Sequence, residues 1–430
     1  MRLQMKLFRE WRAVRWQLKR QGFAFDYVYA TAITCFFLAF LASAVVAKLS
    51  ALSFFGVEVP HLFTAQHFAL FPFVMLFLLV SITFYQHRVV AHRSAKNLHP
   101  ILHILFMYGQ TSTVQASLKT WAGQHRVHHA KGDTKVDPYS VHKFKFSNFW
   151  SYMWAHFMAF FYKSPHKEEY DRAAAKLNQQ VPLADFQDKY YLPLVVGVLA
   201  LNAFVVMLLC SETISWGNYG IALLFQMGII GAVHQITWMV NSCTHTRNEN
   251  NPRKSSKWSA VDRPVWTIFS LLPLGEGNQH RGHHDFASDF YNGATTRFVY
   301  DPTGWFGWSL SKIGLVELTQ ANPQMLYQHH FEGGVECILC KIPAKLKGKM
   351  QAAAHTMRED LNPKLDEVRH AWQDLQRART AYIGEKNRAL KEAQHQAHEK
   401  WKAVCKDVDV YVENCLHTLQ QHSLSTVAID

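Results

Sequence analysis

Four long stretches of this 430-residue chain contain no Lys, Arg, Asp or Glu, although charged residues make up 18% of the whole. A transmembrane α-helix needs about 20 consecutive, mainly apolar residues. One such stretch could be a buried helix of a soluble protein, but four of them argue against that class. We therefore predict transmembrane helices at 27–47, 66–86, 191–210 and 218–240.

Positive charge is almost absent from the two short connections, which join the first helix to the second and the third to the fourth. Of the 45 Lys and Arg residues, only Lys48 lies in these connections. Because basic segments stay on the cytoplasmic side, the helices should form two hairpins with both termini in the cytoplasm. The net charge of +13 then reflects membrane topology, and we expect no binding to nucleic acid.

The chain also lacks the cysteine spacing of a disulfide framework. Its seven cysteines are scattered, which is typical of reduced thiols in an intracellular or membrane-embedded protein. Cys337 and Cys340 form one CxxC pair, half of a metal knuckle, and no second CxxC accompanies it. We therefore expect no zinc knuckle there.

Histidine, by contrast, is abundant, with 25 residues, and much of it is clustered. In a helix, residues i, i+3 and i+4 lie on one face, so each HxxHH motif should present three imidazoles together. His87 and His92 are five apart and would diverge on a straight helix, so we expect a helix end or kink between them. The clusters are HRVVAH (His87, His92), HRVHH (His125, His128, His129) and HRGHH (His280, His283, His284).

A further candidate ligand pair follows the fourth hydrophobic stretch, where Asn241 and His245 are four apart and share a helix face. Together with the clusters it brings nine imidazoles to the predicted cytoplasmic side. One tetrahedral zinc takes about four ligands, so nine favour two metals. Imidazole binds iron, copper and zinc alike, so ligand type leaves the metal open. His234 lies two turns deeper and is expected to be a hydrogen-bonded membrane residue.

The two ends of the chain have helical patterns of different kinds. Residues 1–26 combine seven basic residues with apolar ones, which fits an interfacial helix or an unstructured positive anchor equally well. Residues 361–430 are charged, with apolar residues at intervals of three and four. This pattern predicts a long amphipathic helical tail, which follows a linker at 311–360.

The order HxxxxH, HxxHH, HxxHH, with NSCTH before the last box, resembles the membrane fatty-acid desaturases, within them the stearoyl-CoA (Δ9) branch. WAGQHRVHH and GEGNQHRGHH match segments of that family. The resemblance covers residues 27–310. It implies an all-α integral membrane fold, with four transmembrane helices in two hairpins under a cytosolic helical cap that carries a histidine-rich dimetal site.

The resemblance also assigns roles to residues. Asn241 would act through a bound water, and Gln115, Trp121 and Thr237 match positions at the kink of a bent acyl tunnel. Acidic neighbours should orient the ligands, with Asp133, Asp137, Glu276 and Asp285 as candidates. The di-iron ligands would be His87, His92, His125, His128, His129, His245, His280, His283 and His284.

The implied activity is an O₂-dependent fatty-acyl desaturase that introduces a cis double bond, at Δ9, into a long-chain acyl thioester. Removing hydrogen from an unactivated methylene needs an oxidant that side-chain acids and bases do not supply, which favours two iron ions with O₂ as co-substrate. The chain contains no HPGG motif of a fused cytochrome, so the electron donor should be a separate ferredoxin, rubredoxin or cytochrome.

Three alternatives stay open. Gly123 and Gln124 stand where the family often has Arg-Asp, which helps to hold CoA, so the carrier is acyl-CoA or another acyl carrier. A lipid or carotenoid hydroxylase or ketolase would carry the same histidine boxes. A non-catalytic metal-binding membrane protein is an alternative of another class.

Overall fold

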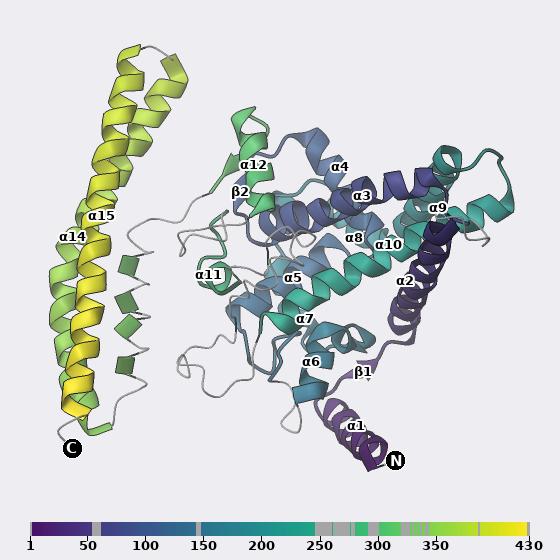
Figure 1. Ribbon diagram of the computed structural model, residues 1–430, viewed down its shortest axis with the longest axis horizontal. Helices are drawn as coiled ribbons and strands as arrows, with labels where there is room; N and C mark the ends of the chain where they lie inside the picture. The colour runs from purple at the N-terminus through teal and green to yellow at the C-terminus, as the bar shows by residue number, and fades with distance from the viewer. Residues whose placement is uncertain are drawn as a thin grey trace. The chain divides into compact units, whose positions relative to one another are not determined.

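The computed structural model divides the chain into two compact units, residues 1–247 with 257–320 and residues 248–256 with 321–430. Most of the described residues are helical (Figure 1). The structure describes residues 2–53, 62–142, 148–245, 260, 276, 280–290, 301–319, 344–385 and 388–427, together with four residue pairs between 327 and 339.

Among the described residues of the first unit, four helices are long and apolar enough to cross a membrane, which confirms the four predicted segments. The second membrane segment changes its helix type, because α3 continues directly into the π-helical stretch η1. Helix α10 packs against α2, α9 and α3 (Figure 1). The helices are α2 (Tyr27–Ser53), α3 (Ala65–Val80) with η1 (Ser81–Ala91), α9 (Tyr191–Cys210) and α10 (Trp216–Cys243).

Two glycines of α10 allow it to lie close to α2. A Cβ atom on Gly231 would lie 2.4 Å from the carbonyl oxygen of Phe36, and one on Gly228 would lie 2.2 Å from Ser43 Oγ. Ser43 Oγ also donates a hydrogen bond to the carbonyl of Leu224, at 2.8 Å. Small residues of this kind let membrane helices approach closely, and they hold the two hairpins together here.

The described part of the first unit also contains shorter helices and two small strand pairs. Strands β1 (Ala24–Phe25) and β3 (Tyr162–Lys163) pair antiparallel, as do β2 (Ala95–Lys96) and β4 (Glu317–Leu318). The helices are α1 (Arg2–Arg20), α4 (Pro100–Ser112), α5 (Leu118–Ala130), α6 (Asn148–His156), η2 (Met158–Phe161), α7 (Lys167–Ala174), η3 (Leu177–Gln179), α8 (Ala184–Lys189), α11 (His280–Asp285) and α12 (Pro302–Lys312).

Helix α5, which carries the second histidine cluster, is held on several sides. It packs against α7, η1 and α8. Gly123 lies at the contact with α7, where a Cβ atom would be 2.3 Å from the carbonyl oxygen of Tyr170. Ser117 caps the helix by accepting a hydrogen bond from the backbone N–H of Thr120, at 3.2 Å. These contacts fix the position of α5 against η1, the continuation of the second membrane helix.

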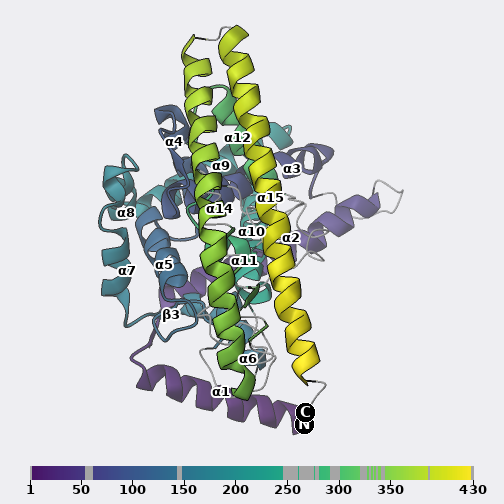
Figure 2. The ribbon, with the colours of Figure 1, turned by 90° about the vertical axis from the view of Figure 1, so that its left-hand side faces the viewer.

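The second unit is a helical hairpin. Helices α14 (Ala344–Glu385) and α15 (Arg388–Val427) lie side by side (Figures 1 and 2). Their buried residues include Leu365, Val368 and Val412, which belong to one hydrophobic cluster. The predicted amphipathic helical tail is thus confirmed, and α14 begins at Ala344, inside the segment expected to be a linker.

Candidate metal centre

The first histidine pair is brought together by the π-helical stretch η1. The backbone N–H of His92 donates to the carbonyl of His87 at 3.0 Å, an i→i+5 bond that defines this wider helix. The two ring centroids are therefore only 4.7 Å apart. The helix does end at Ala91, just before His92, but the change to π-helix inside the membrane segment was not expected from the sequence.

The remaining histidines come from three other segments. His125, His128 and His129 share the inner face of α5, where Trp121 stacks on His125 with ring centroids 4.6 Å apart. The third cluster forms α11. His245 follows α10 and forms an isolated antiparallel bridge with Ala260.

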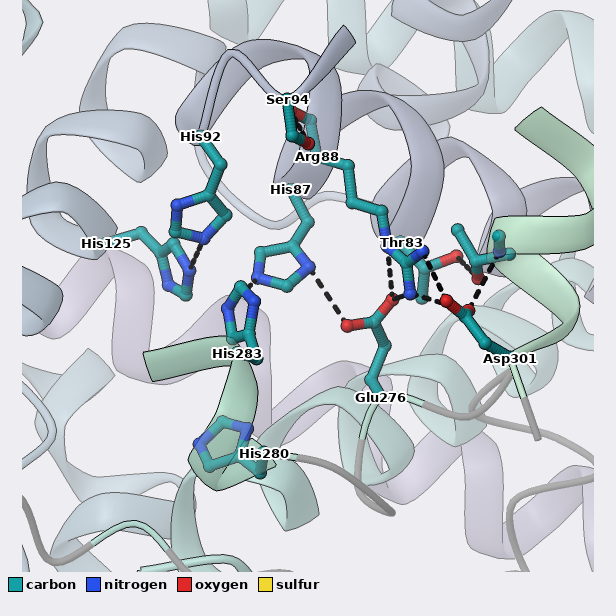
Figure 3. A network of polar contacts seen from close by, with 12 residues as sticks. Thr83, His87, Arg88, His92, Ser94, His125, Glu276, His280, His283 and Asp301 are labelled. Atoms are coloured by element: carbon teal, nitrogen blue, oxygen red, sulfur yellow. Dashed lines mark hydrogen bonds and ion pairs between the residues drawn. The ribbon is translucent and has the colours of Figure 1, made fainter. Parts of the chain in front are cut away.

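The nine histidines converge in two groups, and within each group the candidate ligand atoms lie within 4.8 Å of one another. In the first group, Nε2 of His87 lies 3.0 Å from Nε2 of His283 (Figure 3). In the second, Nε2 of His280 lies 2.9 Å from Nε2 of His245. The groups are His87, His92, His125, His129 and His283, and His128, His245, His280 and His284.

The environment of these rings suits metal ions. Several buried ring nitrogens have no hydrogen-bond partner among the described residues, including Nε2 of His128 and both nitrogens of His129. A buried polar nitrogen without a partner is costly, so such a cluster needs an acceptor of its lone pairs. Five and four inward-facing imidazoles exceed what one tetrahedral ion takes and fit two ions.

Burial also controls protonation of the cluster. Loss of hydration, followed by repulsion between neighbouring rings, holds the pKa of each affected imidazole well below its ordinary value. These rings are therefore neutral at neutral pH, the form that binds metal. The affected residues are His92, His125, His129, His245, His280, His283 and His284.

His128 behaves differently because a carboxylate contacts it. Burial again lowers its pKa, but the charge and hydrogen bond of Asp137 outweigh burial and leave the pKa raised. His128 Nδ1 lies 2.9 Å from Asp137 Oδ1, and both side chains are 1% exposed. Asp137 in turn accepts the backbone N–H groups of Asp133 and Tyr139. The carboxylate therefore fixes the ring and turns Nε2 towards the second group.

Glu276 plays the same part in the first group. Its Oε2 lies 3.2 Å from His87 Nδ1, which leaves Nε2 of that ring facing His283 (Figure 3). Two of the four acidic candidates thus contact cluster histidines. The carboxylate of Asp133 instead lies 3.9 Å from Nε2 of His142, and the side chain of Asp285 is outside the described part of the chain.

Arg88 is a residue of this network that sequence reasoning missed. Its guanidinium is 1% exposed and donates to Glu276 Oε1 from Nε and Nη2, at 3.1 and 2.8 Å (Figure 3). It also binds both carboxylate oxygens of Asp301, at 2.7 Å each, and the carbonyl of Phe290. Arg88 thereby joins η1 to Glu276 and to Asp301, the N-cap of α12. The motif HRVVAH gave no sign of these contacts, because it shows only that a basic residue follows His87.

An apolar cavity of about 520 Å³ leads towards the first group. Gln115, Trp121 and Tyr139 line this cavity and also a smaller neighbouring space. His87 and Asn241 line the smaller space as well. Gln115 Nε2 donates to Thr237 Oγ1 at 3.1 Å. The three predicted tunnel residues and Asn241 therefore surround one space next to the histidines.

Other candidates lie apart from the cluster. His234 lies deeper along α10, and its Nε2 is 2.7 Å from the carbonyl oxygen of Thr113, as expected of a hydrogen-bonded membrane histidine. Gln124 accepts a hydrogen bond from the Tyr139 hydroxyl, at 2.8 Å. Cys337 and Cys340 are outside the described residues.

Among the described residues, four helices able to cross a membrane and a cluster of nine histidines, eight buried and His92 partly buried, define an integral membrane protein with a candidate metal centre. Residues 63–292 match the family model for fatty acid desaturase, more than half of the chain. The chain therefore belongs to the fatty acid desaturase family.

Named relatives agree with this assignment. The chain is 30% identical over 239 residues to a probable acyl-CoA desaturase of Schizosaccharomyces pombe, covering 55% of this chain and 45% of the relative. It is 30% identical over 209 residues to an sn-1 stearoyl-lipid 9-desaturase of Anabaena variabilis, covering 48% and 66%. It is 27% identical over 260 residues to stearoyl-CoA desaturase 5 of Bos taurus, covering 59% and 71%. The match thus spans about half to two thirds of the length of these relatives.

Proposed function

We propose that this chain is an O₂-dependent fatty-acyl desaturase that introduces a cis double bond, at Δ9, into a saturated long-chain acyl group. The observation that carries the proposal is an apolar cavity whose inner end lies beside two groups of closely packed histidines. The names of relatives support both the acyl substrate and the position, since they include acyl-CoA and stearoyl-lipid 9-desaturases.

The two histidine groups would each hold one iron ion, with Asn241 bound to one of them through a water. Imidazole alone does not distinguish iron from copper or zinc, so the choice of iron rests on the family. When bound, the iron pair supplies the O₂-dependent oxidising power that an unactivated C–H bond requires. The reaction removes two hydrogens from the acyl chain and reduces O₂ to water with electrons from a donor.

The chain's own residues would orient the ligands and the substrate. Asp137 and Glu276 hold Nδ1 of His128 and His87, so that Nε2 faces the metal position. Trp121 and the Gln115–Thr237 pair narrow the cavity beside the histidines, which would place one part of the acyl chain next to them. The apolar part of the lining would keep water away from the reacting carbons.

Topology and partners complete the proposal. The distribution of basic residues favours a cytoplasmic metal centre with both termini on the same side. A separate ferredoxin, rubredoxin or cytochrome would deliver electrons there, and a long-chain acyl carrier such as acyl-CoA would deliver the substrate.

The proposal is tested by expressing the chain, with a competent electron donor, in a host that makes no unsaturated fatty acids. Gas chromatography–mass spectrometry of total lipids should show a new monounsaturated acid. His128→Ala and His283→Ala, one from each histidine group, should abolish it. An unchanged profile from folded, iron-loaded protein contradicts the desaturase proposal, whereas a hydroxylated acid supports the hydroxylase alternative.

A further inference from the structure

A second cleft, of about 630 Å³, lies beside the acyl cavity, between α1 and the β1–β3 strand pair. Phe23 and Tyr162 line both spaces, so the two are neighbours. Figure 1 shows α1 leading through β1 into α2. Because α2 begins at Tyr27, the cleft is expected at the level of the lipid head groups.

One wall of this cleft is strongly basic. Arg12, Arg15 and Lys19 line it from positions three and four apart on α1, so they share one helix face. Trp11 and Trp16 lie on the same side of the helix and also line the cleft. The adjacent face of α1 is anchored, since Val14 and Leu18 pack in a cluster with Trp154, and Leu18 also reaches the floor of the cleft.

These cations have no carboxylate partner among the described residues. Arg12, Arg15 and Lys19 take part in no described ion pair, in contrast to the lysines at the mouth of the acyl cavity. There, Lys163 lies 3.7 Å from Asp26, and Lys167 pairs with Asp171. Positive charge is therefore available in the basic cleft, whereas Lys163 and Lys167, which line the acyl cavity, each face a carboxylate.

Gly123 and Gln124 replace the Arg-Asp pair that the resemblance links to CoA binding. Gly123 has no side chain, and the carbonyl of Tyr170 leaves no room for one. Gln124 is engaged by the Tyr139 hydroxyl. This position therefore offers no charged partner to a head group attached to an acyl chain in the cavity.

We propose that Arg12, Arg15 and Lys19 form a binding site for the phosphate-bearing head group of the acyl donor. The inference rests on the proposed desaturase function, because it assumes that the neighbouring cavity takes an acyl chain. Arginine binds phosphate through two parallel hydrogen bonds, and the adjacent tryptophans suit the membrane interface. Both a phospholipid and acyl-CoA carry such a phosphate.

The test compares two double variants of the full chain in maltoside micelles, which contain no phosphate. Arg12→Gln/Arg15→Gln removes two charges that line the cleft. Lys6→Gln/Arg9→Gln removes two from the same helix that do not line it. Binding is measured with stearoyl-CoA, with distearoyl phosphatidylglycerol and with octadecanol, which has the chain but no phosphate.

The cleft variant should bind at least one phosphate-bearing donor about tenfold more weakly, with octadecanol binding unchanged. Loss for stearoyl-CoA alone assigns the site to CoA phosphates, and loss for the phospholipid alone assigns it to a lipid head group. Equal loss in both double variants, or no loss for either donor, overturns the proposal. Because binding needs no turnover, a chain without desaturase activity could still show the selective loss.

Discussion

At the scale of single residues, the histidines differ in what holds their second ring nitrogen. His128 and His87 are each held at Nδ1 by a carboxylate, and the carboxylate of Glu276 is itself held by Arg88. The ligand candidates could be predicted from the spacing of the boxes. Arg88 could not, because its partners Glu276 and Asp301 are 188 and 213 residues away and no local pattern connects them.

Replacing Arg88 with Gln should destabilise the protein strongly. The change leaves the carboxylates of Glu276 and Asp301 buried without their cation, which costs about 3–5 kcal/mol for a broken buried ion pair. His87 also loses its fixed orientation, so bound metal should fall below two ions per chain. Thermal unfolding in detergent and metal analysis measure both effects.

Arg88→Lys is the matched control, since it keeps the charge and loses the planar fork that binds both carboxylates. Its melting temperature and metal content should lie between wild type and Arg88→Gln. Full metal content and an unchanged melting temperature in Arg88→Gln would show that this residue does not position the site.

The protonation of the histidines predicts how stability depends on pH. Seven rings have a pKa lowered in the folded state, so the unfolded chain binds more protons once the pH falls below the unfolded value of about 6.5. The metal-free protein should therefore lose stability steadily on acidification below that value. His128, with a raised pKa, opposes this trend and contributes stability that is lost as the pH rises.

Thermal unfolding of the metal-free protein between pH 8 and pH 5 checks this expectation. The melting temperature should fall as the pH is lowered below about 6.5, because the seven rings with a lowered pKa outnumber the one with a raised pKa. A melting temperature that rises on acidification would mean that the rings are not held neutral by burial.

At the scale of elements, the sequence predicted which segments cross the membrane. It did not predict the type of helix within those segments or the pairing of the C-terminal helices. Charge-free runs of sufficient length identified all four spans. Apolar composition does not distinguish an α-helix from the π-helical stretch of Ser81–Ala91, because the difference lies in backbone hydrogen bonds. The pairing of α14 with α15 was not predicted either, because an amphipathic pattern does not tell which partner a helix packs against.

The contact between α2 and α10 gives a prediction with a control on the same helix. Gly231→Ala would place a Cβ atom 2.4 Å from the carbonyl oxygen of Phe36, so the helices must separate. The free energy of unfolding should fall by about 1–3 kcal/mol, as for other overpacked sites. A Cβ atom on Gly220 would have no neighbour within 4 Å, so Gly220→Ala should leave the free energy of unfolding unchanged or raise it slightly. Equal melting temperatures for the two variants would contradict this contact.

At the scale of the whole molecule, the candidate centre depends on four segments that are distant in sequence. The ends of α3–η1 and α10 bring His87 and His245 to the level of α5 and α11. Hydrophobic pattern and charge predicted that these segments converge. They did not predict the division into five and four histidines, which follows from packing between segments.

That division predicts that metal can be lost from one histidine group while the other group keeps its ion. His92→Ala removes one of five rings in the first group, whereas His245→Ala removes one of four in the second. Each variant should lower bound metal towards one ion per chain, with the His245→Ala effect larger because fewer ligands remain. Elemental analysis of purified protein measures the ratio, and two ions retained in both variants would contradict the two groups.

The most direct measurement is product analysis with the purified, iron-loaded protein, an electron donor, O₂ and a labelled stearoyl donor. Mass spectrometry should detect a product lighter than the substrate by two hydrogens, and its cleavage at the double bond should place that bond at carbon 9. A product heavier by one oxygen, or no O₂-dependent product from protein with two bound iron ions, would contradict the desaturase proposal.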